Sequence, residues 1–70
     1  MSKPYYTVVA WAIEEEVWVD LYGSYDRKDC RDEIDWLNRW EYQSPTIITT
    51  DGSAEQLIAH LDTLNKSDKN

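Results

Sequence analysis

Apolar and polar residues alternate along this chain with the periods of strands and helices, and the longest helical pattern covers Asp26–Tyr42. One side of that helix would carry the apolar positions Cys30, Ile34 and Leu37, at i, i+4 and i+7. Trp36 and Trp40 form a second apolar row about 100° round the same helix. Asp26 is the expected N-cap, with Ser24 as the alternative. An apolar arc this wide predicts either a helix pressed into a groove or a core face that continues into an exposed aromatic edge.

The N-terminal half predicts a β-hairpin. Tyr5–Ile13 is rich in aromatic and β-branched residues and is apolar on both faces, which is typical of a central strand. Val17–Tyr22 alternates more cleanly. Its expected inward positions are Val17, Val19 and Leu21, and its expected outward positions are Trp18, Asp20 and Tyr22. The acidic break between the two runs is short enough to connect antiparallel strands.

The C-terminal half predicts a third strand and a second helix. Pro45 ends the first helix, because the residue before a proline avoids the α region. Thr46–Thr50 is a β-branched run and is expected to be a strand. A capping box that begins at Ser53 starts a second amphipathic helix, which should end near Asn65 and leave a polar, frayed tail at Lys66–Asn70.

These elements predict an α+β fold in a single domain over residues 1–70, with an ordered core in 5–65 and a frayed tail in 66–70. The element order is β-β-α-β-α. The most apolar strand belongs in the middle, so we expect a three-stranded, mainly antiparallel sheet of order 2-1-3, with the two helices on one face. The expected core residues are Val9, Trp11, Ile13, Val17, Val19, Leu21, Cys30, Ile34, Leu37, Ile47 or Ile48, Leu57, Ile58, Leu61 and Leu64.

Charge narrows the range of partners. Fourteen acids against seven bases give a net charge of −7 at pH 7. This balance disfavours direct binding to nucleic acid or to anionic membranes and favours a protein partner with a basic surface. The alternative interpretation is that the excess acid simply keeps a small protein soluble. No apolar run approaches the ~20 residues that span a bilayer. The N-terminus lacks a signal-peptide pattern, and the single cysteine excludes an internal disulfide, so we expect a cytoplasmic protein.

Patterns for catalysis or metal binding are weak. Acids recur at every third position of the first predicted helix, at Asp26, Asp29, Asp32 and Asp35. Bases lie among them, and ion pairs along the helix explain this spacing more simply than a cation site does. Cys30 and His60 each fall in an amphipathic pattern, and together they cannot make the usual zinc set. We therefore expect no enzymatic activity, no metal and no cofactor.

The aromatic residues point to an interface. Four Trp and five Tyr, with no Phe, favour rings that carry a polar group, as protein interfaces do. We predict a non-catalytic protein that binds another protein. The expected binding surface comprises Glu14, Glu15, Glu16, Trp18, Asp20 and Tyr22. The alternative surface comprises Asp29, Asp32, Asp35, Trp36 and Trp40.

In size and general layout the chain is similar to phage-encoded proteins that inhibit host enzymes or defence systems, including small inhibitors of host RNA polymerase and anti-CRISPR proteins. This resemblance implies an inhibitor whose partner handles nucleic acid, because an acidic surface can imitate phosphates toward a basic groove. The alternative function is a homodimeric structural or adaptor module that associates through an exposed aromatic sheet face.

Overall fold

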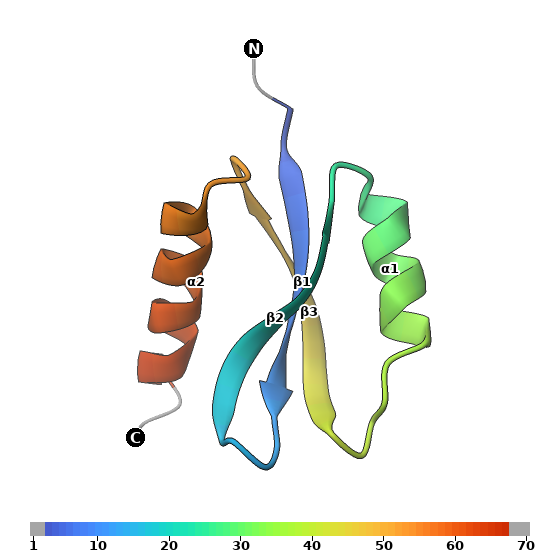
Figure 1. Cartoon of the computed structure of the whole chain (residues 1–70), viewed down its shortest axis with the longest axis vertical. Helices are drawn as coiled ribbons and strands as arrows, with labels where there is room; N and C mark the ends of the chain where they lie inside the picture. Colours follow the sequence, from blue (N-terminus) through green and yellow to red (C-terminus); the bar gives the residue numbers. More distant parts are fainter. Residues whose placement is uncertain (1–2, 68–70) are drawn as a thin grey trace.

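A central antiparallel sheet and two helices form the fold in the computed structural model, which describes residues 3–67 (Figure 1). The strands are β1 (Tyr5–Ala12), β2 (Val17–Ser24) and β3 (Tyr42–Thr50), and the helices are α1 (Arg27–Asp35) and α2 (Ala54–Ser67). β1 lies in the middle and pairs antiparallel with both neighbours, in the order β2-β1-β3. The predicted class, element order and strand order are confirmed.

The two helices lie on opposite faces of the sheet, so the expectation that they share one face is wrong. Figure 1 looks along the sheet with β2 nearest the viewer, and it shows α1 on one side and α2 on the other. The Cys30 thiol of α1 lies 3.5 Å from the carbonyl oxygen of Tyr6. Leu57 of α2 instead lies beside Tyr5 and Thr7, which point to the other face. β1 is apolar on both faces because both faces are covered.

The core therefore lies on both sides of β1. Its buried apolar residues are Val8, Val9, Ala10, Ala12 and Cys30. Most of the other predicted core residues are half-buried. Ile58 is 63% exposed, because it falls beside the stripe that α2 turns toward the sheet.

Helix α1 is much shorter than predicted, ending at Asp35 with Trp36 as its C-cap. Asn38 forms a competing turn: its side-chain oxygen accepts a hydrogen bond from the Trp40 N–H (2.9 Å), and its carbonyl accepts one from the Glu41 N–H (3.2 Å). The last helical turn also contains no base to complement the helix dipole. Residues 36–41 are consequently a connection rather than a helix.

β3 begins earlier than predicted and runs through Pro45. Its register with β1 shifts by one residue between the pairs Val9–Thr46 and Trp11–Gln43. Ser44 has a φ of 53° at this shift. A bulge on an edge strand is where a sheet tolerates a proline, so Pro45 interrupts the ladder without ending the strand.

Helix α2 starts where the capping pattern predicts. The Ser53 hydroxyl accepts a hydrogen bond from the Gln56 N–H at 3.2 Å. The Gln56 side chain does not reach back to Ser53 but accepts from the Asp51 N–H at 3.0 Å, which ties the β3–α2 turn to the first helical turn. α2 continues to Ser67, beyond the expected end at Asn65. Residues 68–70 of the predicted tail lie outside the described residues.

Candidate protein-binding surface

The hairpin between β1 and β2 is fixed to the connection that follows α1. Its turn spans residues 13–16, and the Glu16 N–H donates to the Ala12 carbonyl at 2.8 Å. The Ile13 N–H donates to the Glu41 carbonyl at 3.0 Å, so the start of β3 lies directly beside the turn. A shallow hollow at this junction is lined by Glu14, Glu15, Glu41 and Tyr42.

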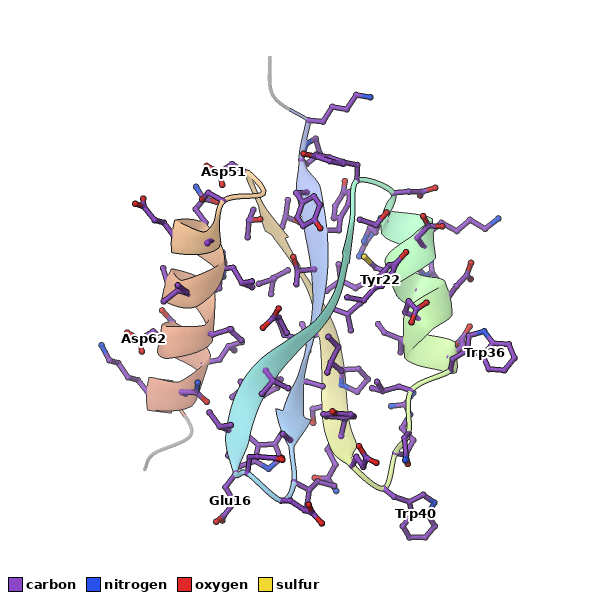
Figure 2. All side chains as sticks on the ribbon, viewed as in Figure 1. Glu16, Tyr22, Trp36, Trp40, Asp51 and Asp62 are labelled. Atoms are coloured by element: carbon purple, nitrogen blue, oxygen red, sulfur yellow. The ribbon has the colours of Figure 1, made fainter. Side chains whose placement is uncertain are left out.

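Two tryptophans project from the same connection. Trp36 is 86% exposed and Trp40 is 90% exposed. Figure 2 shows both rings directed away from the body of the protein, with Trp40 at the same end of the molecule as Glu16. Burying the apolar surface of an indole is favourable by roughly 25 cal/mol per Å². An exposed tryptophan does not make this contribution to the stability of the fold. Tryptophan is enriched in protein–protein interfaces, where its ring is buried by the partner.

The hairpin turn and the connection thus bring together one composite surface, which we call the acidic–aromatic end. It comprises Glu14, Glu15, Glu16, Trp40 and Glu41. Glu14, Glu15 and Glu41 line the hollow at the start of β3, and Glu16 lies at the same end of the molecule. The base nearest to them along the connection is Arg39. All five side chains are exposed, so a partner could reach them without any rearrangement of the fold.

The rest of the predicted surface does not lie together. The β1–β2 register passes from Val8–Tyr22 to Val9–Asp20, so Leu21 is an extra residue in β2. This bulge inverts the alternation of side chains. Tyr22 consequently lies on the α1 side (Figure 2), whereas Asp20 belongs to the α2 side. The expected continuous aromatic sheet face is therefore absent among residues 3–67.

Trp18 is part of the packed sheet rather than an exposed anchor. It is half-buried, and its ring meets that of Trp11 edge-on, with centroids 6.2 Å apart. Its backbone N–H donates to the side-chain oxygen of Asn65 in α2 at 2.7 Å. The expectation that Trp18 faces away from both helices is wrong, because α2 covers that face.

Tyr22 lies in an acidic environment against α1. Burial raises the pKa of its hydroxyl, and the carboxylates of Asp29 and Glu33 raise that pKa further. The neutral hydroxyl is therefore favoured. Tyr22 is half-buried on the α1 side of the sheet, so its ring is not fully exposed to a partner.

The alternative surface is also divided by the structure. Asp26 is the N-cap of α1, as predicted, and its carboxylate accepts from the Lys28 N–H at 2.9 Å. Asp29, Asp32 and Asp35 are exposed along the helix. Asp29 accepts a hydrogen bond from the Ser24 hydroxyl at 3.2 Å and so helps to fix the helix start. Because α1 ends before Trp36 and Trp40, those rings do not form a row along it.

Cys30 and His60, the two residues considered for catalysis or zinc binding, lie apart. Cys30 is buried under α1, and burial raises the pKa of its thiol, with the Asp29 carboxylate raising it further. His60 is exposed on α2, across the sheet, so the two cannot act as a pair. Within residues 3–67, no group of three or more His, Cys, Asp or Glu side chains is arranged to hold a metal ion.

No protein-family model, curated protein or solved structure matches this chain. In the described part of the chain, neither helix is both long enough and apolar enough to cross a membrane.

Sequence reasoning identified Glu14, Glu15, Glu16 and Trp40 but assigned them to different surfaces, and it missed Glu41. The Asn38 turn is what moves Trp40 and Glu41 to the hairpin. Asparagine favours turns over helix interiors, so Asn38 within the predicted helix was the available signal.

Proposed function

We propose that this protein is a non-catalytic binding protein whose acidic–aromatic end docks on a basic surface of another protein and inhibits it. The observation that carries the proposal is the 3.0 Å hydrogen bond from the Ile13 N–H to the Glu41 carbonyl. That bond holds the connection with the 90% exposed Trp40 at the same end of the molecule as the glutamates of the hairpin turn. A carboxylate cluster next to an indole suits a partner that presents arginine or lysine side chains.

The two components of the surface would contribute differently to binding. Carboxylates at the rim speed the encounter with a basic partner, and this effect weakens with salt. A tryptophan that becomes buried slows dissociation, and truncating such an anchor typically costs about 2 kcal/mol or more. An arginine could in addition stack on the face of the Trp40 indole while its guanidinium meets a glutamate.

The proposed partner is a protein that handles nucleic acid. The net charge of −7 and the small size support an inhibitor of the phage type, which would occupy the nucleic-acid-binding groove of a host or defence protein. We place this interaction in the cytoplasm, since a single, buried, free cysteine is typical of a reducing compartment.

The test uses tagged protein to capture a partner from a host-cell extract, with three variants compared side by side. Trp40→Ala and the triple change of Glu14, Glu15 and Glu16 to Gln should each reduce capture of the same protein. Trp36→Ala is the matched control, because it removes an equally exposed indole outside the acidic–aromatic end. The captured protein should retain its activity in the presence of Trp40→Ala and lose it in the presence of wild type.

Binding kinetics of the purified pair then separate the two components. The triple Gln variant should associate more slowly, most clearly at low salt, and Trp40→Ala should dissociate faster. Equal loss of binding in Trp36→Ala and Trp40→Ala, or wild-type kinetics in both the Trp40 and glutamate variants, would contradict the proposed surface.

A further inference from the structure

The two outer edges of the sheet differ in how they are protected. Along β2, the Asn65 side chain bonds the Trp18 N–H at 2.7 Å, Leu21 forms a bulge, and Asp20 places a charge on the edge strand. Bulges, charges and side-chain caps are the devices by which proteins prevent an edge strand from pairing with another chain. The β2 edge is therefore closed to further strands.

The β3 edge has none of these devices over Thr46–Thr50. The register with β1 is regular from Tyr5–Thr50 to Val9–Thr46, and every residue in the run is β-branched and uncharged. Within residues 3–67, no side chain from elsewhere in the fold caps this edge as Asn65 caps β2. In Figure 1 the helices lie to either side of the sheet, and the β3 edge lies at its back.

We propose that the Thr46–Thr50 edge pairs antiparallel with the same edge of a second copy, joining two three-stranded sheets into one continuous sheet with two-fold symmetry. The run Thr46–Thr50 can pair residue by residue with an antiparallel copy of itself. A two-fold axis at Ile48 sets Ile48 opposite its counterpart, Ile47 opposite Thr49, and Thr46 opposite Thr50. Cross-strand pairs of β-branched residues stabilise an antiparallel ladder.

Charge favours this neutral edge over the acidic surfaces for self-association. Two copies, each with a net charge of −7, repel one another wherever acids face acids. The proposed pairing brings only neutral residues into register, and the bulge at Ser44 and Pro45 limits it to the run before Asp51. Because the strands are antiparallel, the two acidic–aromatic ends point away from each other and stay free.

The test measures the sedimentation of wild type and two variants over a range of concentrations. In the first variant, Thr46→Lys and Thr49→Lys place two charges on the edge; both side chains are exposed, so the fold should persist. The matched control, His60→Lys with Thr63→Lys, adds the same charge to exposed positions on α2. Wild type and control should dimerise alike, and the edge variant should associate at least about tenfold more weakly.

Amide hydrogen exchange locates the interface without a mutation. Amides within Thr46–Thr50 should become more protected as the concentration rises, while those of β2 should not change. A wild type that stays monomeric at millimolar concentration, or a dimer that the edge lysines leave intact, would overturn the proposal. Protection of these amides in a monomer, seen only when another protein is added, would also overturn it and assign the edge to a foreign strand.

Discussion

The ring of Tyr5 lies directly across Gly23, so closely that a Cβ atom at position 23 would approach two ring carbons to 2.8 Å. Gly23 pairs with Thr7 in the ladder, and Tyr5 is its diagonal neighbour on the same face. Tyr25 meets the same ring edge-on, with centroids 4.9 Å apart. A glycine weakens a strand by itself, but here the ring occupies the space that a side chain would fill.

We therefore expect Gly23→Ala to lower the free energy of unfolding by about 1–3 kcal/mol, the usual cost of overpacking. Tyr5→Leu should restore part of this loss in the double variant, because the clashing ring is gone. Gly52→Ala provides the comparison: its φ of 89° makes any side chain strained there, and Tyr5→Leu should not rescue it. Chemical denaturation of the wild type and the five variants checks this, and an undestabilised Gly23→Ala would show that the ring moves aside freely.

Stability should fall at alkaline pH because of Cys30. Burial raises the pKa of this thiol in the folded protein. The unfolded chain releases the thiol proton at about pH 8.5, so above that pH it binds fewer protons than the folded chain. The contribution is fully present below pH ~8.5 and is lost as pH rises toward the folded pKa. Unfolding measured against pH should show this decline in wild type and a shallower one in Cys30→Ala; equal slopes would contradict it.

Much of the fold could be predicted from the types of residue along the chain and their spacing. β-branched and aromatic runs gave the strands, and the Ser53 pattern gave the start of α2. The strand order followed from the apolar character of Tyr5–Ala12. The same observation also required a cover on each face of β1, which the expected one-sided arrangement did not provide. Helix placement was thus recoverable from the sequence, but only by giving both faces of the central strand equal weight.

The candidate surface was less predictable, because it depends on single residues that break a regular pattern. The alternating pattern predicts that Leu21 faces inward. Leu21 is instead a bulge residue, and it places Tyr22 on the opposite face of the sheet from Asp20. Asn38 reads as one polar position in a helix, yet its turn ends α1 and carries Trp40 to the hairpin. A one-residue irregularity inverts every later side chain in a strand, and periodicity does not locate it.

Helix α2 should depend on the side chains that it turns toward the sheet. Leu61 is half-buried, so Leu61→Ala should lower the free energy of unfolding by about 2 kcal/mol, near the low end for a buried leucine. Ile58→Ala is the matched control, since Ile58 is 63% exposed and its truncation should change stability by about 0.5 kcal/mol or less. Thermal unfolding of both variants checks this, and equal losses would mean that α2 packs differently from the structure.

Asn38 positions Trp40 without being part of the acidic–aromatic end. Asn38 accepts a hydrogen bond from the Trp40 N–H at 2.9 Å and donates one to the Glu41 carboxylate at 3.3 Å. Asn38→Ala removes both and should lower the free energy of unfolding by about 1 kcal/mol. The Trp40 amide should then exchange faster with solvent. Asn38→Asp is the control, because it keeps the acceptor for the Trp40 N–H while losing the donor to Glu41.

Exchange at the Trp40 amide, followed by NMR, separates the two bonds. Slow exchange in wild type and Asn38→Asp, with fast exchange in Asn38→Ala, would show that the side-chain acceptor fixes the connection. Equal exchange in all three would mean that the backbone bonds to the Asn38 carbonyl suffice. Because Asn38→Ala keeps every residue of the acidic–aromatic end, a loss of partner affinity that follows its faster exchange would come from presentation of Trp40, since no contact residue has been removed.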